Sequence, residues 1–333
     1  MAVKQQVLAV LERQKGQYVS GEALANGAAV SRAAVWKAIE ALRADGYTID
    51  SVKNRGYCLS DDNDILSEAS IGQYLGDVDC RLEVRRTVTS TNTLLKALAE
   101  QGEPAGKVLV AEQQTEGRGR LHRRFYSPPG SGLYLSLLLR PSLTAEAASL
   151  MTTAAAVAVA EAIAEVTGVE TRIKWVNDVY ANGRKVCGIL TEASMDMESG
   201  GLSYAVVGIG VNVTDPPDGF PPELAEIAGS LYGTARCSSD VRSRLAAAII
   251  RRFLAFYAQL EQKPFLEAYR RRSLLDGKTV TYTADGETHT AVVRGIDDDL
   301  RLLVTTENGD ERALSSGEVS IGHRFYESKE TEQ

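Results

Sequence analysis

The sequence contains few of the residues that build disulfide frameworks, zinc sites or catalytic cysteine centres. Its 333 residues include four cysteines and three histidines. The cysteines lie far apart and form no Cys-x-x-Cys pair, and the histidines are isolated from them and from one another. We therefore expect four free thiols, no zinc site and no catalytic cysteine.

Long apolar runs and an export signal are also absent from the sequence. The most apolar stretch, residues 153–164, is short and contains Glu161, so it does not suit the roughly 30 Å of a bilayer core. The first residues lack a basic region followed by an apolar run and a cleavage site. These features favour a buried helix and a cytoplasmic protein without a membrane partner.

The formal net charge of −7 is unevenly distributed along the chain. Residues 1–60 carry eight basic groups against five acidic groups, so this segment has a positive excess. A basic segment on an acidic chain fits a nucleic-acid-binding module joined to a different domain. The length exceeds that of one typical core, so two or three domains are expected.

The first 46 residues have the apolar spacing of three short helices. The third helix begins at Ser31, whose hydroxyl can cap it, and turns Val35, Ile39 and Leu42 to one side. Helix, turn and helix with a basic outer face is typical of proteins that read the major groove of DNA.

Apolar alternation after residue 46 predicts two short strands joined by a tip at residues 53–56, an arrangement that looks like a wing. A recognition helix contacts base edges, and the cations of a wing contact phosphates. The DNA-binding candidates are therefore Ser31, Arg32, Trp36, Lys37, Lys53 and Arg55. The alternative is a small helical domain for protein interaction, because a fold alone does not prove function.

The acidic stretch at residues 60–64 has no periodicity and predicts a linker, so the domains are expected over residues 1–62 and 63–272. Strands and helices are mixed in the second domain. Ser90, Thr91 and Asn92 lie at a strand-to-helix turn, where such residues either cap the helix or bind the polar ring of a ligand.

The segment from Gly117 to Phe125 carries four arginines and two glycines between two strongly apolar strands. Glycines let a backbone close over a ligand, and guanidinium groups match phosphate oxygens. The segment indicates a mobile lid that captures an anion. The bare Gly-Arg-Gly-Arg pattern also fits an RNA-binding segment.

Lys174 ends a predicted strand and is followed by a tryptophan, and then by Asn177 and Asp178. A cation at this position can offset negative charge that develops on a phosphorus centre, and the alternative is a solvated lysine near a turn. Asn182-Gly183 predicts a hairpin. Glycines in the apolar strand at 203–213 permit the close approach of a ligand or another backbone.

The third domain is expected over residues 273–333. A helix at 241–260 precedes it. Four strands separated by turn residues predict a small antiparallel barrel, at 279–283, 291–296, 300–305 and 312–314.

Five motifs, taken in order, resemble those of biotin protein ligases. They are Ser90-Thr91-Asn92, Gly117-Arg118-Gly119-Arg120, Lys174-Trp175-Val176-Asn177-Asp178, Lys185-Val186-Cys187-Gly188-Ile189-Leu190 and Gly208-Ile209-Gly210-Val211-Asn212-Val213. The match covers nearly the whole chain, because residues 1–62, called the head below, resemble the N-terminal domain of the bifunctional ligase-repressors. The resemblance implies an α+β protein with an N-terminal winged helix-turn-helix, a central mixed-sheet domain like those of class II synthetases, and a C-terminal SH3-like β-barrel.

The resemblance also implies a two-step reaction. Biotin attacks the α-phosphorus of MgATP to give biotinyl-5'-AMP, and a lysine of a biotin carboxyl carrier protein of acetyl-CoA carboxylase then takes the acyl group. ATP and Mg²⁺ are co-substrates, and biotin is both substrate and corepressor. A ligand-promoted homodimer, formed through the central sheet, would place two heads on palindromic operator DNA.

Carried over position by position, the resemblance makes Lys174, Arg118 and Arg120 catalytic. The implied biotin contacts are Ser90, Thr91, Asn92, Gln114, Arg118, Gly119, Arg120 and Lys174. The implied nucleotide contacts are Arg118, Arg120, Phe125, Lys174, Asn177 and Asn212, with Phe125 against the adenine and Mg²⁺ near Asn212. Glu318 falls in the matching end motif.

Two positions depart from the family pattern. Many members have a glycine and then a tryptophan after the arginine motif, whereas this sequence has His122 and Phe125. Three alternatives stay open: a biotin-sensing repressor without catalysis, a lipoate or octanoate ligase with the same central architecture, and a ligase whose head is a vestigial dimerisation module.

Overall fold

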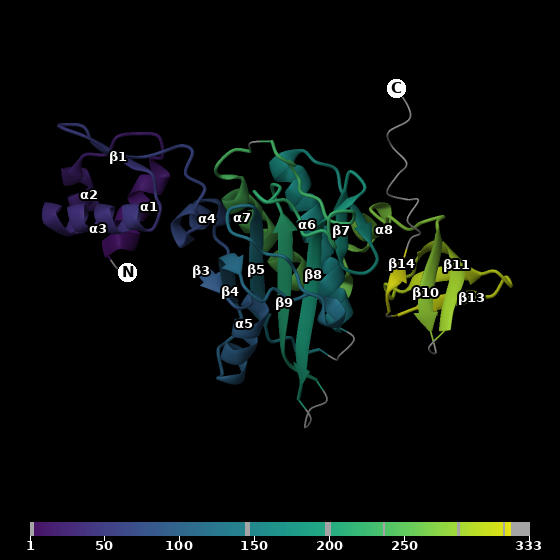
Figure 1. Ribbon diagram of the computed structural model, residues 1–333. Coiled ribbons are helices and arrows are strands. Elements are labelled where there is room, and N and C mark those ends of the chain that lie inside the picture. Colours follow the sequence, from purple (N-terminus) through teal and green to yellow (C-terminus); the bar gives the residue numbers. More distant parts are fainter. Residues whose placement is uncertain are drawn as a thin grey trace. The chain divides into compact units, whose positions relative to one another are not determined.

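The computed structural model describes residues 3–143, 147–196, 201–235, 237–284, 287–315 and 317–320. Its internal contacts divide the chain into two units, which are treated separately below. The first unit comprises residues 1–78 and 237–247, and the second comprises residues 79–236 and 248–333 (Figure 1).

The first unit contains four helices and a hairpin. Their bounds are α1 Val3–Arg13, α2 Gly21–Gly27, α3 Arg32–Ala44, β1 Ile49–Val52, β2 Gly56–Leu59 and α4 Glu68–Leu75. The hydroxyl of Ser31 accepts a hydrogen bond from Ala34 N–H at 3.2 Å and so caps α3, as its sequence predicts. Strands β1 and β2 pair antiparallel, with Ile49 opposite Leu59.

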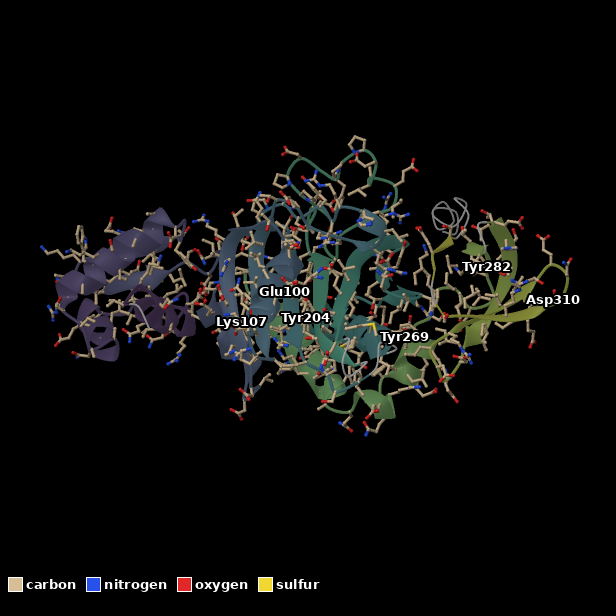
Figure 2. All side chains as sticks on the ribbon, turned by 90° about the horizontal axis from the view of Figure 1, so that it is seen from below. Glu100, Lys107, Tyr204, Tyr269, Tyr282 and Asp310 are labelled. Carbon is tan, nitrogen blue, oxygen red and sulfur yellow. The ribbon has the colours of Figure 1, made fainter. Side chains whose placement is uncertain are left out.

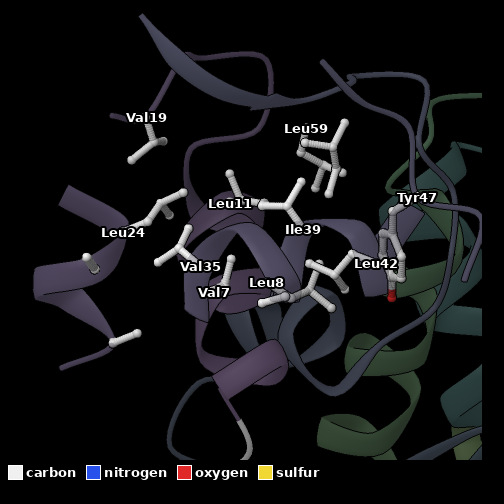
Figure 3. Close-up of a cluster of buried hydrophobic side chains, with 14 residues drawn as sticks. Val7, Leu8, Leu11, Val19, Leu24, Val35, Ile39, Leu42, Tyr47 and Leu59 are labelled. Atoms are coloured by element: carbon white, nitrogen blue, oxygen red, sulfur yellow. The ribbon is translucent and has the colours of Figure 1, made fainter. Parts of the chain in front are cut away.

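The core of the head forms where α1, α2 and α3 meet (Figure 3). Val35, Ile39 and Leu42 of α3 are buried against Val7 and Leu11 of α1, which confirms the inward face predicted from their spacing. Ala38 is buried with them, and the opposite side of α3, with Arg32, Trp36 and Lys37, is exposed.

The loop at residues 60–64 packs within this unit against the beginning of α7 (Val241–Tyr257). Asp64 forms an ion pair of 2.9 Å with Arg242, whose side chain is almost fully buried. The carbonyl of Asn63 accepts a hydrogen bond from Lys15, in the turn that follows α1. The acidic loop is therefore tied to α7 and to the turn after α1, which lie far apart in the sequence.

The second unit is built on a seven-stranded mixed sheet in the order β3-β4-β5-β9-β8-β7-β6. The strand bounds are β3 Arg81–Val88, β4 Lys107–Gln114, β5 Gly132–Leu139, β6 Arg172–Lys174, β7 Asp178–Ala181, β8 Arg184–Met195 and β9 Leu202–Asn212. Strands β3 and β4 are parallel and are connected by α5 (Thr91–Glu100), whereas the other pairs are antiparallel. Figure 2 labels Glu100 and Tyr204, whose hydrogen bond of 3.2 Å ties α5 to β9.

Helix α6 (Ala147–Thr167) packs on β6, β7, β8 and β9. Within the described part of the chain, residues 148–167 form the one helix that is long and apolar enough to cross a membrane. Because 67% of its most apolar window is buried inside the fold, α6 is a core helix, as the sequence predicts.

The C-terminal part begins after α7, a short 3-10 helix (Leu260–Gln262) and α8 (Leu266–Arg271). Five antiparallel strands follow in the order β13-β12-β11-β10-β14, with bounds β10 Thr279–Ala284, β11 Glu287–Ile296, β12 Leu302–Thr306, β13 Glu311–Leu314 and β14 Val319–Ser320. The four expected strands are present, and β14 is an addition. Residues 321–333 of the expected third domain lie outside the described residues.

Candidate active site and nucleic-acid surface

The parallel pairing of β3 and β4 brings the polar triplet to the end of β4. Val88 pairs with Gln114, so the turn into α5 begins beside that glutamine. Ser90 caps α5 by accepting a hydrogen bond from Thr93 N–H at 3.4 Å. The backbone N–H of Thr91 donates to Gln114 Oε1 at 2.9 Å. The structure therefore brings together four residues that the sequence assigns to biotin.

Two further polar residues, Ser136 on β5 and Glu192 on β8, complete this cluster. Ser136 Oγ lies 2.6 Å from Asn92 Oδ1 and 2.7 Å from Thr91 Oγ1. Asn92 Nδ2 donates to Glu192 Oε2 at 3.0 Å. Sequence reasoning missed both residues because their partners are more than 40 positions away, although a lone serine in the apolar β5 was a usable signal.

Glycines on β8 and β9 make room for side chains that approach this face of the sheet. A Cβ at Gly208 would collide with the amide of Asn92, and a Cβ at Gly210 would collide with the ring of Phe125. The same ring would lie 3.2 Å from a Cβ at Gly188. The sequence-based expectation of close approach at Gly208 and Gly210 is confirmed, with protein side chains as the approaching groups.

Phe125 is partly buried on those glycines and packs edge to face on Tyr134, with ring centroids 6.4 Å apart. Its predicted contact with adenine stays a prediction. The arginine segment before it is folded back on itself, because Phe125 N–H donates to Gly117 O at 2.9 Å and Gly119 N–H donates to Arg123 O at 2.8 Å.

His122, one of the two departures from the expected family pattern, has a left-handed backbone with φ of 60°, and Leu121 beside it has φ of 53°. A side chain at such an angle is strained by roughly 1 kcal/mol or more. The left-handed bend at Leu121 and His122 is therefore formed without glycine, at a conformational cost.

The two arginines assigned to the phosphate point to different partners. Arg118 Nη1 lies 3.3 Å from Glu192 Oε1, and Arg120 Nη1 donates to Asn177 Oδ1 at 2.9 Å. A hollow of about 390 Å³ lies beside the segment, lined by Thr93, Glu116, Gly117, Arg118, His122, Arg123 and Arg124. The segment thus surrounds a space with several cations.

The C-terminal part contacts the same segment. Arg123 forms an ion pair of 2.7 Å with Glu318, and Arg120 Nη2 donates to Gly317 O at 3.1 Å. Glu318, which the sequence places in the family's end motif, therefore lies against the arginine segment.

Lys174 lies opposite Asp178 in the β6–β7 pair, and Lys185 on β8 forms an ion pair of 2.7 Å with the same aspartate. Burial lowers the pKa of the Lys174 ammonium, while the charge of Asp178 opposes that shift. Tyr269, labelled in Figure 2, supports the turn by donating to Val176 O at 3.1 Å. Lys185 was part of a quoted motif, but sequence reasoning gave it no role.

The two asparagines assigned to the nucleotide also make backbone contacts. Asn177 Nδ2 donates to Ile189 O at 2.9 Å, and Asn212 Nδ2 donates to Gly229 O at 3.0 Å. In the described part of the chain, no group of three or more His, Cys, Asp or Glu side chains could hold a metal ion.

The outward face of α3 and the β1–β2 tip carry the predicted DNA contacts. Trp36 is 55% exposed, and Lys37 and Lys53 are exposed. Arg32 forms an exposed ion pair of 2.7 Å with Glu22. The guanidinium of Arg55 lies 4.1 Å from the centroid of the Tyr18 ring. DNA contact by these residues, and by the capping residue Ser31, stays a prediction.

Comparison with known protein families gives three matches along the chain. Residues 3–58 match a helix-turn-helix domain, residues 84–212 match the biotin/lipoate A/B protein ligase family, and residues 277–322 match the biotin protein ligase C-terminal domain. The matches follow the order of domains that the sequence predicts.

Individual relatives agree with this assignment. The chain is 32% identical to the bifunctional ligase/repressor BirA of Bacillus subtilis over 96% of this chain and 99% of the relative, and 30% identical to that of Escherichia coli over 92% and 94%. Among solved structures, the biotin protein ligase of Aquifex aeolicus in complex with biotin and ATP has a TM-score of 0.59 and 30% identity, covering 73% of this chain and 98% of that one. The chain belongs to the family of bifunctional biotin protein ligases and repressors.

Proposed function

We propose that the chain activates biotin as biotinyl-5'-AMP and transfers it to a lysine of a biotin carboxyl carrier protein. The observation that carries this proposal is the meeting of the polar cluster around Asn92 with Arg118, through their common partner Glu192. A neutral polar ring and an anionic group can therefore be bound side by side.

The polar cluster would receive the biotin ring, and the cations would receive the reacting groups. Arg118 and Arg120 would hold the adenylate phosphate, because guanidinium groups match phosphate oxygens. Lys174 would offset charge on the phosphorus in the first step and on the acyl oxygen in the second. We add Lys185 as a second cation, since it shares Asp178 with that site.

The chemistry asked of these residues is positioning and charge stabilisation, without a covalent enzyme intermediate. An acyl phosphate must also be kept from water. The arginine segment would serve as the lid, with Glu318 as its contact on the C-terminal part.

The test is biotin-dependent exchange of pyrophosphate into ATP, measured for wild type and Lys174→Ala. We expect exchange in the wild type and a loss of about 100-fold or more in the variant. Lys107→Ala is the matched control, because it removes a lysine that pairs with Glu83 at 2.6 Å at the other end of β4. Wild type that binds biotin without exchange would be a non-catalytic sensor, and competition by lipoate would favour a lipoate ligase.

We further infer that the head represses transcription when ligand is bound. The β1–β2 hairpin would act as a wing that contacts phosphates, and α3 would enter the major groove. The adenylate would favour a homodimer through the central sheet and so act as corepressor. Operator footprinting should show tighter binding with biotin and ATP, and equal binding without them would refute this coupling.

We also keep the domain limits 1–62, 63–272 and 273–333, the SH3-like character of the five-stranded sheet, and the cytoplasm as the location. The antiparallel pairing of the five strands supports the SH3-like character. A Mg²⁺ ion near Asn212 is part of the same proposal.

A further inference from the structure

A chain of hydrogen bonds through the polar cluster ends on Glu192, a carboxylate without an assigned role. Its side chain is 16% exposed and lies on β8. Oε2 accepts from Asn92, while Oε1 lies 2.9 Å from Lys96 Nζ and 3.3 Å from Arg118 Nη1. Three donors, two from α5 and one from the arginine segment, therefore converge on one carboxylate.

These donors keep Glu192 ionised. Burial opposes its charge, but hydrogen bonds from Lys96 and Asn92, with the charges of Lys96 and Arg118, bring the pKa of Glu192 below its ordinary value. An ionised carboxylate can only accept hydrogen bonds. It therefore dictates which end of a neighbouring amide faces it.

The charge of Glu192 sets the direction of the next hydrogen bonds. Asn92 must turn its Nδ2 toward the carboxylate and Leu190 O, which leaves Oδ1 facing Ser136. Because Oδ1 only accepts, the single hydroxyl proton of Ser136 is donated to it. Thr91 Oγ1 then lies 2.7 Å from Ser136 Oγ and 3.1 Å from Gln114 Oε1, and its single proton serves one of these two acceptors.

Burial makes this direction matter for a ligand. Thr91, Asn92 and Ser136 are each less than 5% exposed, so water does not compete for their hydrogen bonds. The ureido ring of biotin has one carbonyl that accepts and two N–H groups that donate. A pocket whose protons point the wrong way would leave buried donors or acceptors unmatched.

We propose that Glu192 is a positioning residue, which holds the amide of Asn92 in one orientation and so sets the hydrogen-bond direction of the pocket that receives the ureido ring. This inference rests on the proposed function, because it takes the cluster as the biotin site. Glutamine in place of Glu192 removes the ionised acceptor and leaves Leu190 O as the remaining acceptor for Asn92 Nδ2, so the hydrogen-bond direction of the pocket is held less firmly.

The test compares the affinities of biotin and of its alcohol analogue, biotinol, by isothermal titration calorimetry. For Glu192→Gln we expect both ligands to bind about tenfold or more weakly, by the same factor. The alcohol lacks the carboxylate that an arginine could hold, so an equal loss reports on the ring. Unchanged affinity for both ligands, or a loss for biotin alone, overturns the proposal.

Ser136→Ala breaks the same chain without changing a charge, and it decides the question if Glu192→Gln does not fold. It should weaken both ligands alike, and the double variant should bind no more weakly than the poorer single variant. Additive losses, or no loss for Ser136→Ala, overturn the proposal.

The matched control is Glu165→Gln, which also removes a carboxylate that pairs with two cations, Arg251 and Arg252, on the exterior of the second unit. Its biotin affinity should equal that of wild type. A wild-type protein that binds neither ligand would refute the proposed function, which is a separate outcome.

Discussion

Replacing Glu12 with glutamine should stabilise the first unit above pH 7 and remove much of its pH dependence. Glu12 lies on α1 with 4% of its surface exposed, and no hydrogen-bond partner of its Oε1 is found in the described part of the chain. Burial raises its pKa to about 7, against the attraction of Lys15. It lines a hollow of about 250 Å³ together with Asp61, Tyr74 and Asp240.

The sign follows from proton binding. In the unfolded chain this carboxyl loses its proton near its ordinary pKa of 4.5, and in the folded chain only near 7. The stabilising contribution of the protonated form is therefore fully present below pH 4.5 and is lost as the pH rises through about 7. A difference of this size corresponds to about 3 kcal/mol at most, since one pKa unit is worth about 1.4 kcal/mol.

The assay is urea unfolding from pH 5 to 8.5 in a Trp175→Phe background. The chain has two tryptophans, so fluorescence then reports on Trp36 in the head. Wild type should lose about 2 to 3 kcal/mol of unfolding free energy relative to Glu12→Gln across this range. Glu40→Gln, which removes an exposed carboxylate of α3, should follow wild type. Parallel pH curves for wild type and Glu12→Gln would refute the reasoning.

Three further substitutions test the site and the head. His122→Gly should relieve the left-handed backbone and so raise the free energy of unfolding by up to about 1 kcal/mol, measured as a slightly higher melting temperature. Arg124→Gly should give no such increase. Gly210→Ala should cost about 1 to 3 kcal/mol of unfolding free energy because its Cβ meets the Phe125 ring, whereas Gly72→Ala, with open space around it in α4, should cost nothing. Lys53→Ala should weaken operator binding uniformly across sequences and lower the salt dependence by about one phosphate contact, and an unchanged salt slope would exclude Lys53 from the interface.

Local patterns predicted the elements because the forces that form them are local. The cap at Ser31 and the inward face of α3 depend on residues within one or two turns, and both are found as expected. The alternation and turn residues of the C-terminal part placed four strands to within a few residues, but the two-residue β14 has no pattern of its own. The length of an element thus decides whether a sequence pattern can predict it.

Contacts across the sheet were harder to predict from the sequence. The meeting of Thr91 with Gln114 follows from a parallel pair, which sequence spacing can suggest. The partners of Glu192 come from α5 and from the arginine segment, and no local rule joins them. The role of Lys185 was equally hidden in the sequence, because it depends on an ion pair with an aspartate across the β7–β8 pair.

The return of residues 237–247 to the first unit has a consequence for how the protein is made. A ribosome releases the chain from its N-terminus at about 5 to 20 residues per second, so the start of α7 follows residue 78 by on the order of ten seconds or more. During that interval the ion pair between Asp64 and Arg242 cannot form. The head is thus first to be synthesised, yet its unit is completed only after most of the central sheet has emerged.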